Sequence, residues 1–125
     1  MRLAVVGLVV LAALAIGLGL WVTGGAEQAR RDTRDAQRMA DLRALATHMR
    51  CLDKHGLAIP SQSPLCPEDP TREDPLTGAP YEITQPSAWT LRLCASFEND
   101  PPRHHAAVGF DPETGCLTIS LANEV

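Results

Sequence analysis

Aromatic residues are scarce in this 125-residue chain, which has two Trp, two Phe and one Tyr. Any folded core must therefore be mainly aliphatic. A basic excess is also missing: the formal net charge is −4, and residues 56–125 carry three basic and ten acidic side chains. Nucleic-acid binders present a basic face, so this composition argues against nucleic acid as a partner.

Proline is missing from the first 59 residues, and all ten prolines lie at or after Pro60. Residues 27–55 are thus free to be helical, whereas the C-terminal half is predicted to be rich in loops and strands. Six of the prolines fall between 60 and 80, where no apolar period is present. We therefore predict a Pro-rich loop over residues 56–80.

Established catalytic motifs are missing too: there is no Gly-x-Ser-x-Gly, no Gly-rich phosphate loop and no His-Glu-x-x-His. His104 and His105 follow two prolines in a segment typical of an exposed loop, with no nucleophile motif beside them. We predict solvated loop histidines, no catalytic residues and no cofactor, and we do not expect an enzyme.

A long apolar run is present at residues 3–22, without charge or proline. Twenty helical residues rise about 30 Å, which matches the hydrocarbon core of a membrane. The run is longer than the usual core of a signal peptide, about 7–15 residues, although Gly24 and Ala26 would suit a cleavage before Glu27. Residues 1–26 are predicted to be an uncleaved transmembrane signal-anchor, ending at Gly24-Gly25.

Two signals oppose each other on the orientation of the domain. Arginines cluster after the apolar run, and the positive-inside rule alone would place the domain in the cytoplasm. Four cysteines in so small a domain are typical of an oxidising compartment. We give the cysteines more weight and predict that residues 27–125 form an extracytoplasmic, periplasmic domain, held by a single span in an inner membrane.

Residues 27–55 are predicted to form one amphipathic helix that covers a small sheet. Apolar residues recur at steps of three and four, giving one stripe: Met39, Leu42, Leu45 or Ala46, Met49 and Leu52. Charged residues between them, Arg38 and Asp41 included, are expected on the other faces. The interleaved arginines and aspartates around Asp32 and Asp35 also predict a solvated face. Gly56 suits the position just after the helix.

Residues 81–125 are predicted to form the antiparallel sheet. A strand over 81–84 and a turn over 85–88 precede a strand over 89–97. Alternation in this second strand places one set of side chains toward the helix: Trp89, Leu91, Leu93, Ala95 and Phe97. A second hairpin is expected from strands over 107–110 and 116–121.

The cysteines fit this arrangement in pairs. Cys94 and Cys116 share the polar parity of their strands, so a disulfide between the two strands is geometrically allowed. Cys66 lies in the Pro-rich loop and Cys51 near the helix end, and a bond between them would contribute about 3 kcal/mol by restricting the unfolded chain. Four cysteines permit three pairings. We predict Cys51–Cys66 and Cys94–Cys116.

These features together resemble the pseudopilins of type II secretion and the C-terminal domain of type IV pilin-like proteins. The likeness is carried by residues 41–43 and 54–60 of the helix and, most specifically, by residues 74–82, Asp-Pro-Leu-Thr-Gly-Ala-Pro-Tyr-Glu. Residues 91–98 also resemble a strand of small membrane-anchored bacterial proteins of unassigned role. The resemblance implies an α+β fold, with a transmembrane helix and an amphipathic helix packed on a three- to four-stranded antiparallel sheet. The chain lacks the family's processing motif before the apolar run, and the run contains no Glu.

Two segments share the pattern Asp-Pro-x-Thr-Gly, at residues 74–78 and 111–115. Asp accepts hydrogen bonds from following amides, Pro presets φ, and Gly takes the left-handed position, so each segment is predicted to be a turn. Some pseudopilins bind calcium in a C-terminal loop, which would make Asp111 and Glu113 ligands. Two carboxylates fall short of the six to eight oxygens that calcium takes, so we prefer the turn.

A zinc site is a further candidate, because Cys51 and His55 share a helix face and Cys66 could join them, with His104 or His105 as a fourth ligand. The spacing matches no established zinc pattern, and oxidised cysteines do not bind metal, so we predict no metal. The predicted function is that of a non-enzymatic, membrane-tethered envelope protein that acts through protein–protein contacts, with a secretion-associated role implied by the resemblance. The alternative is a membrane-anchored domain that binds a metal or small ligand.

Overall fold

The computed structural model describes residues 1–22, 24–99 and 108–121 of the chain. Two helices come first, α1 (Arg2–Val22) and α2 (Gly25–Lys54). Four strands follow: β1 (Glu82–Ser87), β2 (Thr90–Cys94), β3 (Phe110–Asp111) and β4 (Cys116–Ser120). The chain divides into two compact units, Met1–Arg31 and Asp32–Val125.

Helix α1 is apolar from Leu3 to its end, and none of its side chains is buried. By length and composition it can cross a membrane, a property that membrane anchors share with signal sequences. The helix ends at Val22, and Gly24 and Gly25 adopt positive φ angles of 77° and 69° as α2 begins. Residues with side chains rarely adopt such angles, so the predicted helix break at the two glycines is confirmed.

Helix α2 ends at a glycine cap, as predicted. Gly56 has a φ of 65°. Its amide donates to the Asp53 carbonyl oxygen at 2.9 Å, and the Leu57 amide donates to the Leu52 carbonyl oxygen at 2.9 Å. These two bonds satisfy carbonyls that the helix would otherwise leave unpaired at its end.

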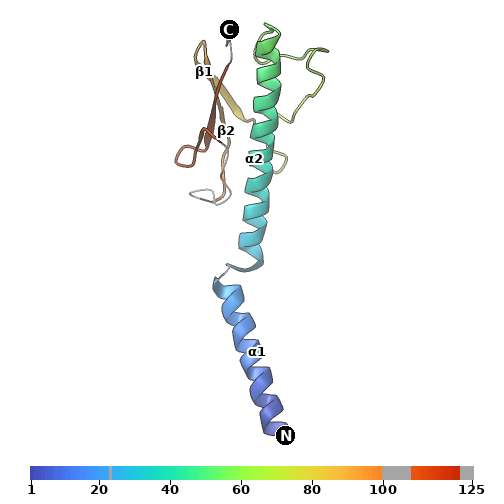
Figure 1. Cartoon of the computed structure of the whole chain (residues 1–125), viewed down its shortest axis with the longest axis vertical. Helices are drawn as coiled ribbons and strands as arrows, with labels where there is room; N and C mark the ends of the chain where they lie inside the picture. The colour runs from blue at the N-terminus through green and yellow to red at the C-terminus, as the bar shows by residue number, and fades with distance from the viewer. Residues whose placement is uncertain (23, 100–107, 122–125) are drawn as a thin grey trace. The chain divides into compact units, whose positions relative to one another are not determined.

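The core lies between α2 and the sheet, which Figure 1 shows alongside this helix. Every predicted stripe residue of α2 is buried, from Met39 to Leu52. Their partners come from the strands and the residue that follows β4: Leu91, Leu93, Leu117, Ile119 and Leu121. The core is mainly aliphatic, with Tyr81 as its one fully buried aromatic among the described residues.

The sheet is open and antiparallel, with the strand order β1-β2-β4-β3. Leu93 of β2 lies opposite Leu117 of β4, and Cys94 lies opposite Cys116. Alternate residues therefore face the core, as the parity of β2 and β4 predicted. The arrangement of α1, α2 and the four strands is of the α+β class.

The first hairpin differs from the prediction. A turn was expected over 85–88, but β1 continues through Pro86 to Ser87, with a shift in register between Thr84 and Ser87. Pro86 is tolerated because β1 is an edge strand. Ser87 pairs with Thr90, so only Ala88 and Trp89 remain for the turn. Trp89 is consequently 58% exposed and does not pack in the core.

The other strands are shorter than expected. β2 ends at Cys94, whereas the prediction extended it to residue 97. In the second hairpin, β3 begins at Phe110, and Ala107, the expected start of that strand, lies outside the described residues.

Candidate functional site

A buried ionic cluster lies on α2, centred on Arg38, which is 3% exposed. Its Nε donates to Asp74 Oδ2 at 2.6 Å, and its Nη1 donates to Asp35 Oδ1 at 3.0 Å and to Glu98 Oε2 at 3.1 Å. Glu98 also accepts a hydrogen bond from Arg34 Nη2 at 2.9 Å. Two arginines of α2 thus hold carboxylates from the helix, from the Pro-rich loop and from the segment after β2.

Asp35 fastens the segment after β2 to the helix. Its two carboxylate oxygens accept hydrogen bonds from the backbone amides of Glu98 at 2.8 Å and Asn99 at 2.9 Å. The Asn99 side-chain amide donates to the same carboxylate at 2.9 Å. Because Asp35 is 1% exposed, these bonds and the one from Arg38 replace the water that the carboxylate loses on burial.

A second buried pair joins α2 to the start of β1. The Tyr81 hydroxyl donates to Asp41 Oδ2 at 2.6 Å, and Gln37 donates to the other carboxylate oxygen at 2.9 Å. Burial raises the pKa of Tyr81 above its ordinary value, and the hydrogen bond to Asp41 raises it further. The phenol therefore remains a proton donor at neutral pH.

The electrostatics of the cluster favour the charged forms. Burial alone lowers the pKa of Arg38, but hydrogen bonds to Asp74, Glu98 and Asp35 outweigh it, and the net shift is upward. Burial alone raises the pKa of Asp74, and the hydrogen bond from Arg38 reverses this, so the net shift is downward. The hydrogen bond from Arg34 is the main cause that lowers the pKa of Glu98 to about 2.

The prediction that Asp35, Arg38 and Asp41 face solvent was therefore wrong. Their partners come from positions 36 to 64 residues further along the chain, and no local charge pattern reveals them. One signal was present nonetheless. Asp35 and Arg38 continue the three–four spacing of the apolar stripe toward the start of α2, which places them on the core-facing side.

The described charged groups of the cluster are all engaged in contacts that hold segments of the fold together. Each buried charge in it has an oppositely charged or hydrogen-bonding partner. Removing one partner from such an arrangement leaves an uncompensated charge in the interior, at a cost of about 3–5 kcal/mol. We assign the cluster the task of positioning the loop and the segment after β2 on α2.

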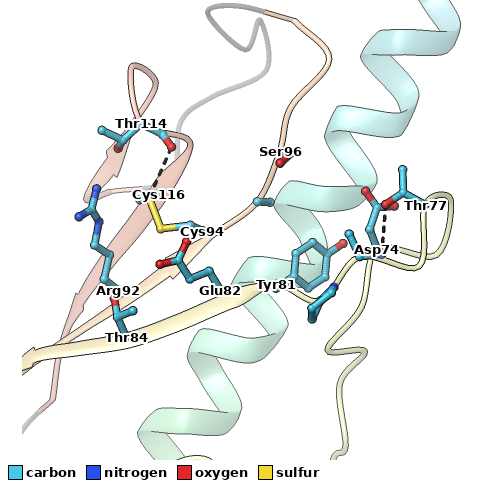
Figure 2. A pocket seen from close by; sticks show the side chains of 13 residues that line it. Asp74, Thr77, Tyr81, Glu82, Thr84, Arg92, Cys94, Ser96, Thr114 and Cys116 are labelled. Atoms are coloured by element: carbon cyan, nitrogen blue, oxygen red, sulfur yellow. Dashed lines mark hydrogen bonds between the residues drawn. A yellow bond between two sulfur atoms is a disulfide. The ribbon is translucent and has the colours of Figure 1, made fainter.

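A hollow of about 420 Å³ lies at the end of the sheet where β1 and β2 begin to pair, beside the Cys94–Cys116 disulfide. Figure 2 shows Glu82, Thr84 and Arg92 near the disulfide, and Tyr81 and Asp74 at the opposite side. The remaining lining residues are Thr77, Ala79, Pro80, Ala95, Ser96 and Thr114.

The described lining of this hollow offers hydroxyls and two carboxylates but no histidine or lysine. Asp74 already accepts hydrogen bonds from Arg38 and from the Leu76 amide. A serine or threonine nucleophile needs a positioned base, and this lining does not pair one with a hydroxyl.

The structure contains the predicted disulfides, Cys51–Cys66 and Cys94–Cys116. It also brings His55 to the first pair: the donor atoms of Cys51, His55 and Cys66 all lie within 4.8 Å of one another. Here the two sulfurs are bonded to each other. The proposed fourth ligands, His104 and His105, lie outside the described residues.

The two Asp-Pro-x-Thr-Gly segments are turns, as predicted. Asp74 Oδ1 accepts from the Leu76 amide at 2.9 Å. Asp111 Oδ1 accepts from the Glu113 amide at 3.0 Å, and Asp111 Oδ2 accepts from the Thr114 hydroxyl at 2.9 Å. Both oxygens of Asp111 are thus used within the turn, which favours the turn over the calcium site.

No family model, no curated protein and no solved structure matches this chain. Its interpretation therefore rests on its own residues and geometry.

Proposed function

We propose that this chain is a membrane-tethered, non-enzymatic envelope protein whose extracytoplasmic domain acts through protein–protein contacts. The observation that carries the proposal is the distribution of apolar side chains. From Leu3 onward α1 is apolar, and none of its side chains is buried, whereas α2 and the sheet enclose most of their large apolar side chains in one core. A helix of this kind needs a lipid environment, and the second unit does not.

The cysteines support the extracytoplasmic side. Every cysteine of the chain is in a disulfide, and disulfides persist in oxidising compartments. The arginines that follow α1 favour the opposite orientation. Arg30 and Arg31 lie near Glu27, and Arg34 is engaged by Glu98. Acidic residues contribute little to the orientation signal, so these pairs leave it in place, and the proposal gives the disulfides more weight.

A pseudopilin-like, secretion-associated role is the finer form of this proposal. Its support is the order of elements and the segment 74–82, which in this fold supplies Asp74 to Arg38 and Tyr81 to Asp41. The most specific part of the sequence resemblance is thus the part that attaches the loop to the helix. The apolar run contains no Glu, whereas the filament proteins it resembles carry one there, so we favour a single-copy tether over a filament subunit.

Trp89 is the best candidate for a contact residue of the domain. It lies in the two-residue turn of the β1–β2 hairpin and is 58% exposed, although its size favours burial. Tryptophan is enriched among the residues that carry most of the binding energy of protein interfaces. We propose that this turn enters a pocket of an envelope partner.

Orientation is tested by labelling cysteines in intact cells. After treatment with a membrane-impermeant phosphine reductant, we expect a membrane-impermeant maleimide to label the full-length protein without cell lysis. Labelling that begins only after lysis would place the domain in the cytoplasm and contradict the proposal. Labelling without the reductant would show that the disulfides do not form in the cell.

The contact is tested by placing a photo-crosslinking amino acid at Trp89 in the same cells. We expect a discrete cross-linked product of defined mass from this position. Thr118 provides the matched control, because it is exposed on β4. No product from either position, or the same product from both, would reject Trp89 as the contact.

A further inference from the structure

We propose that Cys51, Cys66 and His55 form a redox-gated zinc site. The Cys51–Cys66 disulfide excludes metal, and its reduction by a dithiol releases two thiolates that bind a zinc ion together with His55. This inference is independent of the protein–protein role proposed above, which requires no metal.

Three features bring the ligands together. Cys51 and His55 are one helical turn apart, and the His55 amide donates to the Cys51 carbonyl oxygen at 3.2 Å, which preserves helical spacing beyond the end of α2. Cys66 comes from the Pro-rich loop, where its amide donates to the Ser63 carbonyl oxygen at 3.0 Å. The three donor atoms lie within 4.8 Å of one another. Among the described residues, no other group of three meets the same criterion.

The required movement is small. The sulfurs are 2.01 Å apart in the disulfide. Two thiolates at 2.3 Å from a tetrahedral zinc ion are about 3.8 Å apart, so breaking the bond and rotating the side chains suffices. His55 is exposed and can turn toward the sulfurs without displacing the core.

The reaction balances without any group beyond the dithiol. The dithiol gives two electrons and two protons to the S–S bond and becomes a disulfide itself, while Cys51 and Cys66 become thiols. Zinc then displaces one proton from each thiol and binds two thiolates and the neutral imidazole. Water takes the fourth position, as in zinc sites that have three protein ligands.

Access to the bond differs between its two cysteines. Cys66 lines a hollow of about 450 Å³ together with Ser63, Pro64 and Pro67. Cys66 is 4% exposed whereas Cys51 is half-buried, so a dithiol can attack the bond at Cys51, and the metal can approach from the exposed side of His55. His48 lines the same hollow and is buried, with its Nδ1 unpartnered among the described residues.

The test uses the full-length protein in detergent micelles, with Co²⁺ and then Zn²⁺ as the added metals. Reduction with dithiothreitol is followed by anaerobic removal of the reagent. We expect the reduced protein to bind one equivalent of Co²⁺ with a thiolate-to-cobalt charge-transfer absorption, which one equivalent of Zn²⁺ abolishes. The oxidised protein should take up less than a tenth of an equivalent. Equal uptake by the two forms would overturn the proposal.

Variants then assign the ligands. Reduction also opens Cys94–Cys116, so Cys51→Ser should lose the absorption and Cys94→Ser should keep it; the opposite result would overturn the assignment. His55→Ala should weaken Co²⁺ binding at least about tenfold. Lys54→Ala, a matched change at the neighbouring exposed position, should alter it less than twofold. Equal affinities for His55→Ala and the parent would show adventitious binding by thiols of a loosened chain, and would refute the site.

Discussion

The two Asp-Pro-x-Thr-Gly turns, at residues 74–78 and 111–115, have the same motif and similar local hydrogen bonds, yet different residues of each contact the rest of the molecule. In the first, the Asp74 side chain is 5% exposed and bonded to Arg38 of α2. In the second, Asp111 is exposed. Among the described residues, its carboxylate accepts hydrogen bonds only from Glu113 and Thr114 of the same turn.

For the glycines, it is the second turn whose residue lies close to the rest of the molecule. Gly78 and Gly115 have nearly equal φ angles, 71° and 70°, as the motif requires. A Cβ atom at Gly78 would meet open space, whereas one at Gly115 would lie 2.7 Å from the Ala95 carbonyl oxygen. The motif therefore determines the turn, and the surroundings determine which of its residues is indispensable.

The largest difference between the turns is expected for removal of the aspartate charge. Asp74→Asn should lower the free energy of unfolding by about 3 kcal/mol, because the buried Arg38 guanidinium loses one of its negatively charged partners. Asp111→Asn should lower it by less than about 0.5 kcal/mol, because asparagine serves the same exposed turn position. Chemical unfolding of the full-length variants in micelles, followed by circular dichroism, measures both.

Equal losses for the two asparagine variants would contradict this assignment. The cost of Asp74→Asn is placed at the low end of the range for broken buried pairs, because Asp35 and Glu98 still contact Arg38.

A smaller difference, in the opposite direction, is expected for the glycines. Gly78→Ala should lower the free energy of unfolding by about 1 kcal/mol, because a residue with a Cβ atom is strained in the left-handed conformation. Gly115→Ala should cost about 2–3 kcal/mol, because its Cβ also collides with the Ala95 backbone. Thermal unfolding of the two variants compares them directly, and a cost for Gly78→Ala as large as that for Gly115→Ala would show that the collision is relieved.

The last comparison concerns acid. A carboxyl whose pKa is lower in the folded state stabilises the fold above its unfolded pKa and loses this contribution as pH falls through its folded pKa. Both Asp74 and Glu98 have lowered pKa values, that of Glu98 falling from 4.5 to about 2. Stability should therefore decline between about pH 4.5 and 2.

This decline should be shallower in Asp74→Asn, because only Glu98 of the two carboxyls then remains to be protonated. Unfolding of the wild type and the variant at a series of pH values checks the slopes. Parallel slopes would show that Asp74 does not contribute to the acid sensitivity.

Local periodicity was sufficient to predict the apolar stripe of α2 and the facing of β2 and β4, and hence the Cys94–Cys116 disulfide. Cys51–Cys66 was predicted instead from the place of Cys51 near the helix end and of Cys66 in the loop. Local periodicity failed where the burial of a residue depends on a partner far away in the sequence. Arg38 was assigned to solvent because its charge outweighed its position on the stripe, and only Asp74 and Glu98, supplied by distant segments, make its burial possible.

Trp89 illustrates a second kind of failure. Its alternation with Leu91 and Leu93 is genuine, but alternation does not reveal where strand pairing begins. The Ser87–Thr90 pair closes the hairpin one residue after Trp89, and the Trp89 amide is 3.3 Å from the Ser87 hydroxyl oxygen that accepts its hydrogen bond. The zinc candidate of Cys51, His55 and Cys66 was named from the sequence and set aside because oxidised cysteines do not bind metal, and the structure adds that the three donor atoms lie within 4.8 Å of one another.

Pro86 and the shifted register of β1 have a consequence for crowding. An edge strand offers unpaired amides and carbonyls to any strand of another molecule, and proline removes one donor and interrupts that template. Proteins confined to a surface by one helix encounter their own copies far more often than freely diffusing ones do. Under the proposed membrane tether, copies of this chain can collide repeatedly through this edge without their sheets fusing into an aggregate.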